Sequence, residues 1–350
     1  MADAPAATAA ARLVDDLPPV AELRGVDRAR FDSDIAADDR PVVLRGLVAE
    51  WPAVRAATSP QGIHDYLVPL ALPVPVNAFL GEPEIEGRYF YRPDAQGLNF
   101  ATVKTSLDQL LGALLAIDQG GDRQAVYMGS TPTPQILPAF ARDNPLDLVA
   151  GRPTEPRIWI GNSSRIAPHF DESDNIACVV SGKRRFVLFP PEQVANLYIG
   201  PLDRTVAGQP TSMVDLAAPD LERFPRFEQA LASATVAFLE PGDAIFIPSL
   251  WWHGVESTGP LNILVNYWWS DTPAGSGSGL HALGHGLLTI SHLPETKRRA
   301  WRAMFDHFVF QLDGNPAEHI PPAARGILGR TSPEVRQAIR QYLIRALQSL

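Results

Sequence analysis

The stretch APHFDESDN, residues 167–175, decides both the fold and the kind of site that this sequence predicts. Residues two apart in a β-strand point to the same face, so His169 and Asp171 would present an imidazole and a carboxylate side by side. Two histidines and one carboxylate on one face of an octahedron leave three adjacent positions of a metal ion open. His169 and Asp171 therefore predict part of a facial metal site, and a second histidine has to come from elsewhere.

Residues 240–256, EPGDAIFIPSLWWHGVE, provide that histidine. His253 follows a Pro-Gly-Asp turn and a predicted strand, so an antiparallel return can bring it beside His169. A His-x-Asp pair alone is a weak signal, because most histidines are hydrogen-bonded core or surface residues. Its combination with the later Trp-Trp-His sequence favours a metal site formed by His169, Asp171 and His253.

Two other histidines, His281 and His285, are spaced i and i+4 and could share a helix face, as the ligands of many zinc sites do. No acidic or further ligand accompanies them at a useful spacing, and a Gly-Ser-rich run precedes them. We interpret this pair as the start of a solvated helix.

Short apolar segments separated by turn residues fill the sequence around these motifs, which predicts a barrel or sandwich. The turns Ser181-Gly182 and 240–243 have the residues of hairpin connections. The predicted strands cover 157–161, 175–180, 184–189, 236–239, 244–248 and 261–269.

The flanking sequence divides the chain into three predicted segments. Residues 1–12 would be a disordered terminus, 13–275 the main domain and 276–350 a helical region. The first third mixes a strand at 42–44 with a helix from Leu107 that Ser106 caps. In the helical region we expect helices at 287–293, 295–312 and 332–350. The apolar stripe of the last one predicts packing on its own domain or a homodimer through the C-terminal helices.

Composition excludes several classes of protein. A formal net charge of −9 disfavours a nucleic-acid partner, which usually requires a basic face. No apolar stretch is long enough to span a bilayer, and the Ala-rich N-terminus lacks the basic and hydrophobic parts of a signal peptide, so we expect no membrane association and a cytoplasmic location. The single cysteine, Cys178, rules out an internal disulfide and is interpreted as a buried core residue.

The segments APHFDESDN (167–175), SGKRRFVLFPPEQ (181–193), ERFPRFE (222–228), EPGDAIFIPSLWWHGVES (240–257) and NILVNYWW (262–269) occur in an order that resembles a known family. They are similar to the JmjC/cupin-like Fe(II)/2-oxoglutarate-dependent oxygenases, among them the asparaginyl hydroxylase that acts on hypoxia-inducible factor. RPVVLRGLVAEW (40–51) resembles the strand that opens many of these proteins. The resemblance implies that 13–275 is a catalytic domain with a mainly β fold, a double-stranded β-helix or jelly roll with flanking helices.

The resemblance also implies roles for single residues. His169, Asp171 and His253 match the ligands of Fe(II), and Arg184 stands where the hydroxylase has the lysine that anchors 2-oxoglutarate. Strand alternation places Arg184 on the face of Phe186, opposite Lys183 and Arg185, and a cation flanked by apolar residues suits a buried anion site. A solvated basic patch better suits the other two basic residues.

Three further residues match family positions near the co-substrate, namely Asn175, Asn266 and Tyr127. Ile166, in contrast, stands where the hydroxylase has a co-substrate-binding threonine. Ser173 and Pro210-Thr211 replace polar residues that hold the hydroxylase's peptide, so asparagine hydroxylation is not carried over. Of the paired tryptophans 251–252 and 268–269, alternation lets at most one of each pair face the pocket.

The expected activity is oxidation by O2 with 2-oxoglutarate as co-substrate, which releases succinate and CO2 and hydroxylates a protein side chain, a peptide or a small molecule. One alternative is a cupin enzyme that uses another divalent metal for isomerisation or lyase chemistry. Another is a non-catalytic, metal-binding interaction protein. Release of succinate would separate the oxygenase from both.

Overall fold

The computed structural model describes residues 13–120, 124–206, 208–273, 275–329 and 332–348. The expected disordered terminus at 1–12 lies outside these residues. The chain divides into two compact units, Met1–Ser270 and Asp271–Leu350. No helix among the described residues is long and apolar enough to cross a membrane.

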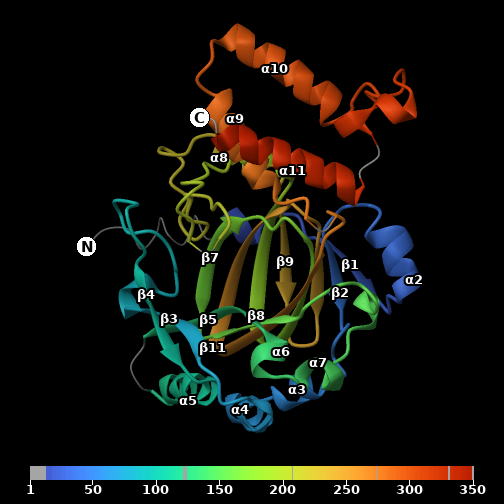
Figure 1. Cartoon of the computed structure of the whole chain (residues 1–350). Coiled ribbons are helices and arrows are strands. Elements are labelled where there is room, and N and C mark those ends of the chain that lie inside the picture. The colour runs from blue at the N-terminus through green and yellow to red at the C-terminus, as the bar shows by residue number, and fades with distance from the viewer. Residues whose placement is uncertain (1–12, 121–123, 207, 274, 330–331, 349–350) are drawn as a thin grey trace. The chain divides into compact units, whose positions relative to one another are not determined.

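Eleven strands in the described part of the first unit form one hydrogen-bonded sheet, which folds into a jelly roll (Figure 1). Its order is β1-β2-β10-β8-β11-β6-β5-β3-β4, with β9 beside β8 and β7 beside β11. The predicted fold class is therefore confirmed. The strands are β1 (Ala21–Arg24), β2 (Val42–Arg45), β3 (Val76–Gly81), β4 (Phe100–Thr105), β5 (Ala125–Pro132), β6 (Arg157–Gly161), β7 (Ser164–His169), β8 (Asp174–Phe189), β9 (Thr235–Leu239), β10 (Ala244–Ile247) and β11 (Trp252–Trp269).

The two long strands β8 and β11 connect the layers of the jelly roll. In one layer, residues 174–179 of β8 pair with residues 264–269 of β11, and this layer continues into β10 and β6. In the other layer, residues 183–189 of β8 pair with residues 252–258 of β11, and this layer continues into β9 and β7. The pairing shifts register between Thr258 and Ile263, opposite Ser181. A single strand pair therefore carries the chain from one layer to the other.

This arrangement corrects the two predicted hairpin connections. Ser181-Gly182 lies inside the continuous strand β8, and Gly182 has a φ of +73° at the corner between the layers. Residues 240–243 do form a turn, but β9 and β10 pair with different parts of β8 and not with each other. Glycine at positive φ serves a corner as well as a hairpin, so the residue types alone could not separate these structures.

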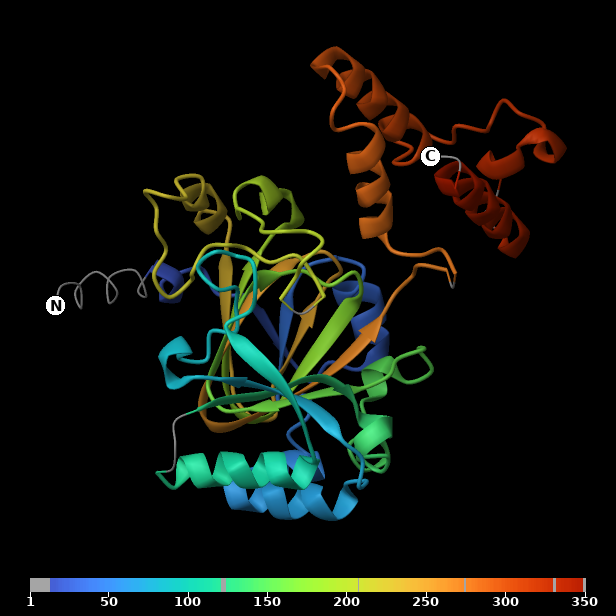
Figure 2. The ribbon, with the colours of Figure 1, turned by 60° about the vertical axis from the view of Figure 1, so that its left-hand side comes forward.

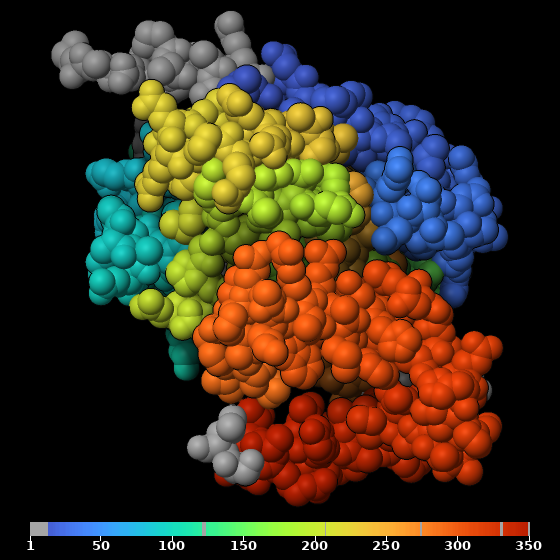
Figure 3. Space-filling model, turned by 90° about the horizontal axis from the view of Figure 1, so that it is seen from above, coloured from blue at the N-terminus to red at the C-terminus, as the bar shows by residue number. Residues whose placement is uncertain are grey.

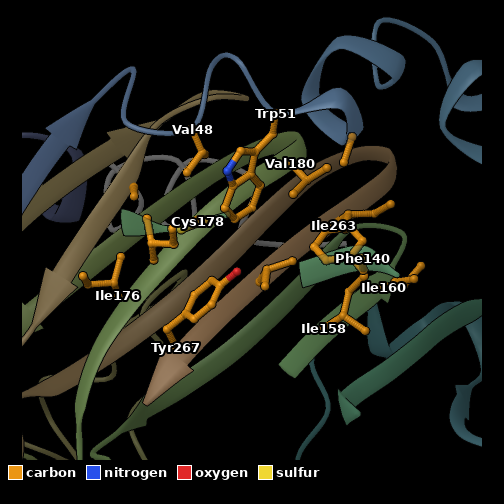
Figure 4. Packing of buried hydrophobic residues seen from close by; sticks show 14 of the residues in the cluster. Val48, Trp51, Phe140, Ile158, Ile160, Ile176, Cys178, Val180, Ile263 and Tyr267 are labelled. Carbon is orange, nitrogen blue, oxygen red and sulfur yellow. The ribbon is translucent and has the colours of Figure 1, made fainter. Parts of the chain in front are cut away.

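Both faces of the first part of β8, residues 175–181, are buried, which explains the continuous apolar run from Ile176 to Val180. Ile176, Cys178 and Val180 point into one core cluster together with Trp51 and Phe140, as Figure 4 shows. Ala177, Val179 and Phe186 belong to a second cluster on the other face. The predicted burial of Cys178 is thereby confirmed. Each large side chain in these clusters contributes about 1.5–3 kcal/mol of burial free energy.

Short helices cover the first cluster. α4 and α5 lie side by side (Figure 2), and α5 begins at the predicted cap, where Ser106 and Gln109 bond each other's backbone N–H groups. The helices of this unit are α2 (Arg28–Arg30), η1 (Phe31–Ile35), α3 (Pro52–Ala56), α4 (Pro60–Leu67), η2 (Val68–Leu70), η3 (Pro83–Ile85), α5 (Leu107–Asp118), α6 (Thr133–Ile136), α7 (Phe140–Asp143), η4 (Asp147–Val149), η5 (Pro191–Ala195) and α8 (Phe227–Leu231).

The connection between β8 and β9 covers one end of the jelly roll. It runs from Pro190 to Ala234 and forms a continuous light green to yellow part of the surface in the space-filling view (Figure 3). A bridge between Thr211 and His169 and a hydrogen bond from Ser212 N to Pro168 O join it to β7. This long segment therefore reaches the predicted metal site.

The second unit is helical, with α9 (Gly279–Thr289), α10 (Glu295–Phe308), η6 (Pro322–Ala324), η7 (Gly326–Leu328) and α11 (Pro333–Gln348). The helix expected at 287–293 is wrong in its bounds, because α9 begins at Gly279 and ends at Thr289. Among the described residues of this unit, only Pro316 and Ala317 are buried. The unit therefore has almost no core of its own.

Gly161 offers a test of how tightly the sheet packs behind the site. A methyl group on Gly161 would lie 2.6 Å from Val126 O and 2.7 Å from the ring of Tyr127. We expect Gly161→Ala to lower the free energy of unfolding by about 1–3 kcal/mol, since the backbone carbonyl has to move. Gly112→Ala, in open space on α5, should raise it by about 0.5–1 kcal/mol. Urea unfolding measures both; a Gly161→Ala protein as stable as wild type contradicts the prediction.

Candidate active site

Antiparallel pairing of β7 and β11 makes His169 and His253 direct partners, as the sequence predicted. Their ring centroids lie 4.4 Å apart. Asp171 follows the end of β7, and a hydrogen bond of 2.8 Å from Leu250 N to Asp171 O ties this segment to the approach to β11. His253 Nε2 lies 3.8 Å from Asp171 Oδ2. The three side chains, 84 residues apart at most in sequence (253 − 169), therefore meet at one end of the jelly roll.

Backbone carbonyls fix the tautomer of both histidines. His169 Nδ1 lies 3.0 Å from Ala167 O, and His253 Nδ1 lies 3.0 Å from Trp251 O. A carbonyl oxygen only accepts, so each Nδ1 must carry the proton, and each neutral ring keeps a lone pair on Nε2. A histidine that binds a metal through Nε2 usually donates a hydrogen bond from Nδ1 in this way.

His253 is also held in the neutral form that a metal ligand requires. Burial is the largest cause that lowers the pKa of His253 to about 4, and the neighbouring His169 lowers it further. Asp171 acts in the opposite direction. At neutral pH the imidazole is therefore unprotonated and available as an electron-pair donor.

A chain of two amides supports Asp171. Asn175 Nδ2 donates to Asp171 Oδ2 at 3.4 Å, and Asn266 Nδ2 donates to Asn175 Oδ1 at 2.8 Å. Both asparagines are buried on β8 and β11, while Asn266 Oδ1 has no hydrogen-bond partner among the described residues. These predicted site residues therefore orient the carboxylate and leave one buried acceptor facing the same region.

A cavity of about 430 Å³ opens beside these groups. All seven residues predicted for the site contribute to its wall, and Trp268 is the one tryptophan of the two predicted pairs that does so. The remaining wall is largely apolar. It consists of Phe79, Tyr89, Phe90, Phe100, Ser130, Trp159, Ile166, Ala167, Glu172, Ser173, Phe186, Val206, Gly208, Gln209, Thr211, Val255 and Leu264.

Arg184 is the most unusual group in this wall. It is 4% exposed, its Nε has no hydrogen-bond partner, and no carboxylate lies within 4 Å of its guanidinium among the described residues. Its neighbours on the opposite face of β8 differ, because Lys183 pairs with Glu240, and Arg185 pairs with Asp15 and Glu256. A buried cation without an acidic partner is costly, and it suits an anion that enters the cavity.

Tyr127 lies beside this cation on β5. Burial raises the pKa of Tyr127 to about 12, and Arg184 lowers it in return. The same two effects act on Arg184, whose pKa is lowered by burial and raised by Tyr127. The phenol therefore stays protonated near neutral pH and can donate a hydrogen bond to an anion held by the arginine.

The sequence reasoning missed several residues of the cavity wall, above all Tyr89, Phe79 and Trp159. A signal existed in the aromatic run Tyr89–Tyr91, which stands out in a loop of otherwise polar residues. The competing pair, His281 and His285, lies on α9 of the other unit with no acidic residue within 4 Å of either histidine among the described residues. Their interpretation as part of a helix is confirmed.

The types of donor at this site, rather than their present spacing, fit a divalent metal ion. Among the described residues, no three His, Cys, Asp or Glu side chains lie as close together as metal ligands do. The 3.8 Å between His253 Nε2 and Asp171 Oδ2 would have to shorten to roughly 3 Å around an ion with ligands at about 2.1 Å. Two imidazole nitrogens and one carboxylate match iron and its neighbours better than they match calcium or magnesium.

Comparison with known proteins gives this site a family context. Residues 28–275 match the family model described as a cupin-like domain. Lysine-specific demethylase JMJ31 of Arabidopsis thaliana is 28% identical over 265 residues, which cover 69% of this chain and 48% of that protein. HSPB1-associated protein 1 of Homo sapiens is 36% identical over 116 residues, 33% of this chain and 23% of that protein.

A third relative matches over nearly its whole length. tRNA wybutosine-synthesizing protein 5 of Mus musculus is 26% identical over 314 residues, which cover 80% of this chain and 91% of that protein. The chain spans about half the length of the Arabidopsis relative and about a quarter of the human one. The names of these relatives state a lysine demethylase, a protein associated with HSPB1 and a protein of tRNA wybutosine synthesis, so the comparisons do not agree on one target.

Proposed function

Because the chain belongs to the cupin-like domain family, as its resemblance to JmjC/cupin-like oxygenases predicted, we propose that it is an Fe(II)- and 2-oxoglutarate-dependent dioxygenase that hydroxylates a protein side chain, a peptide or a small molecule. Relatives named as demethylases and as a tRNA-modifying protein support an enzyme of the oxygenase type. The observation that carries the finer proposal is the buried Arg184, which has no acidic partner among the described residues and lies in the same cavity as His169, Asp171 and His253.

Each residue of the site would have a separate role in binding. The two Nε2 atoms and the Asp171 carboxylate would hold Fe(II), which supplies the redox chemistry when bound. Asn175 would keep the carboxylate in place through its hydrogen bond. Arg184 would bind the remote carboxylate of 2-oxoglutarate with two parallel N–H donors, and Tyr127 would add a third. The apolar wall would exclude water from the reacting groups.

In the proposed reaction 2-oxoglutarate and O2 yield succinate and CO2, and the substrate C–H becomes C–OH. One oxygen atom of O2 enters succinate and the other enters the substrate, so atoms and electrons balance without a further reductant. The test is to load the protein with Fe(II) anaerobically, add 2-oxoglutarate and then O2, and quantify succinate. We expect succinate from wild type and from His292→Ala, an exposed control, and background amounts from His169→Ala. No succinate from wild type, with candidate substrates present, would favour the non-catalytic or other-metal alternatives.

The relative named for tRNA wybutosine synthesis makes tRNA one candidate, whereas the net charge of −9 works against a polyanion. A protein, peptide or small molecule is therefore our preferred substrate class, and the absence of a nucleic-acid partner stays a prediction, as does the cytoplasmic location. Stimulation of succinate release by tRNA but not by peptides would overturn this preference.

We also propose that the C-terminal unit forms a homodimer. Its described residues bury almost no core, while Trp301, Met304 and Phe308 of α10 and Leu343 and Leu347 of α11 are exposed. Helices of this length can supply the roughly 600–1,000 Å² per partner that stable dimers bury. We expect Trp301→Asp with Leu343→Asp to shift the mass measured by light scattering from dimer to monomer, and Arg299→Asp on the polar side of α10 to leave it unchanged. A wild type that is monomeric at micromolar concentration contradicts the proposal.

A further inference from the structure

Tyr89 carries a buried hydroxyl that no described residue binds. The side chain is 3% exposed and lies in the cavity wall, and its hydroxyl oxygen has no hydrogen-bond partner among the described residues. Leaving such a group unsatisfied costs on the order of 1–3 kcal/mol. A hydroxyl in this position therefore points to a partner that enters from the cavity.

The backbone holds Tyr89 in place. Gly87, two residues earlier, has a φ of +73°, and a methyl group there would lie 2.3 Å from Ser163 O. Arg165 N donates to Gly87 O at 2.8 Å, so this loop is attached to the start of β7. Only glycine fits this close approach, which holds the loop before Tyr89 against the start of β7.

The ring of Tyr89 is packed equally firmly. It stacks on Tyr127 with a centroid distance of 5.3 Å and an interplanar angle of 29°, and it meets Phe100 edge to face at 5.4 Å. Ile166 packs against the cluster that Tyr89 and Tyr127 form with Ala125, and its side chain offers no hydrogen-bonding group. Two phenols therefore share one apolar corner of the cavity with few other polar atoms.

The hydroxyl of Tyr89 interacts with that of Tyr127, which in turn interacts with the guanidinium of Arg184. Burial raises the pKa of Tyr89, and Tyr127 raises it further, while Tyr127 in turn interacts with Arg184. A carboxylate offers about four lone-pair sites. The fork of Arg184 can fill two of them and Tyr127 a third, which leaves one acceptor site for a further donor on the same side of the cavity.

We propose that Tyr89 is a positioning residue for the co-substrate, with its hydroxyl donating to the remote carboxylate that Arg184 and Tyr127 hold. The inference rests on the proposed function, because it requires 2-oxoglutarate in this cavity. This role of Tyr89 predicts a selectivity among 2-oxo acids. Tyr89 contributes to the binding of dicarboxylic 2-oxo acids and contributes nothing to the binding of pyruvate, which lacks the remote carboxylate.

The test compares Tyr89→Phe with Tyr91→Phe. Both remove one hydroxyl, but that of Tyr91 donates to Arg204 O and lies outside the cavity wall. Calorimetric titration of 2-oxoglutarate into the anaerobic, Fe(II)-loaded full-length proteins gives the Kd without turnover. We expect Tyr89→Phe to raise the Kd about 10-fold or more, as a hydrogen bond to a charged group predicts, and Tyr91→Phe to leave it at the wild-type value. The Kd of pyruvate should be the same in all three proteins.

The outcomes separate the two proposals. A wild type that binds 2-oxoglutarate while Tyr89→Phe keeps the same Kd overturns the role of Tyr89 and leaves the proposed function standing. Equal weakening of 2-oxoglutarate and pyruvate also overturns it, since that result means a general change of the cavity. A wild type that does not bind 2-oxoglutarate overturns both. Thermal unfolding without ligand provides a second readout, because losing an unpartnered hydroxyl should not lower the Tm.

Discussion

Asp171→Asn is expected to abolish tight Fe(II) binding and to reduce 2-oxoglutarate-dependent succinate release to background. The substitution keeps the size of the side chain and removes the single negative charge that would face the metal beside two neutral imidazoles. Loss of a hydrogen-bonding partner outside the ligand shell costs roughly 10- to 100-fold in metal affinity, so loss of a ligand itself should cost more. Anaerobic titration of Fe(II) with calorimetric detection measures the affinity directly.

Asp147→Asn provides the matched control. It removes the same negative charge from an exposed residue of η4 that lies outside the cavity wall. It should keep wild-type affinity and activity. Circular dichroism of the metal-free proteins checks that Asp171→Asn still folds, which we expect because Asp171 is only partly buried. Wild-type Fe(II) affinity in folded Asp171→Asn would exclude this carboxylate as a ligand.

The sequence was sufficient to predict that the two histidines and Asp171 meet, but the expected hairpin is not the cause. β10 pairs with β2 and β8, and His169 and His253 pair directly because β7 and β11, which are far apart in the sequence, run antiparallel to each other. Asp171 is a different case, because it lies beyond the end of β7 and strand alternation does not govern it there. The hydrogen bond from Leu250 N to Asp171 O provides the constraint instead.

The aromatic wall could not be predicted, because it depends on which distant strands become neighbours. Phe79 and Tyr127 meet through the pairing of β3 with β5, and Trp159 joins them from β6. No local pattern in the first third of the chain specifies this order. The bounds of helix α9 were misplaced for a local reason, since Gly279, Gly284 and Gly286 lower the helix propensity of this segment.

Arg184→Met is expected to change ligand binding and stability in opposite directions. Methionine keeps the length and apolar character of the side chain but removes the charge, so 2-oxoglutarate should bind at least about 100-fold more weakly, as loss of a bidentate, charge-assisted contact predicts. The ligand-free protein should at the same time become more stable, by about 1–4 kcal/mol, because a buried cation without an acidic partner is replaced by an apolar group. A residue that served only the fold would lose stability when truncated.

Arg185→Met on the opposite face of β8 is the matched control for this result. Arg185 pairs with Asp15 and Glu256, so its loss should lower stability and leave the Kd of 2-oxoglutarate unchanged. Thermal unfolding with and without the co-substrate reads both effects. At a 2-oxoglutarate concentration 100 times its Kd, wild type should gain about 2.7 kcal/mol, and Arg184→Met should gain almost nothing. If Arg184→Met instead loses stability and keeps its affinity, the guanidinium is a structural group and the anion has to bind elsewhere in the cavity.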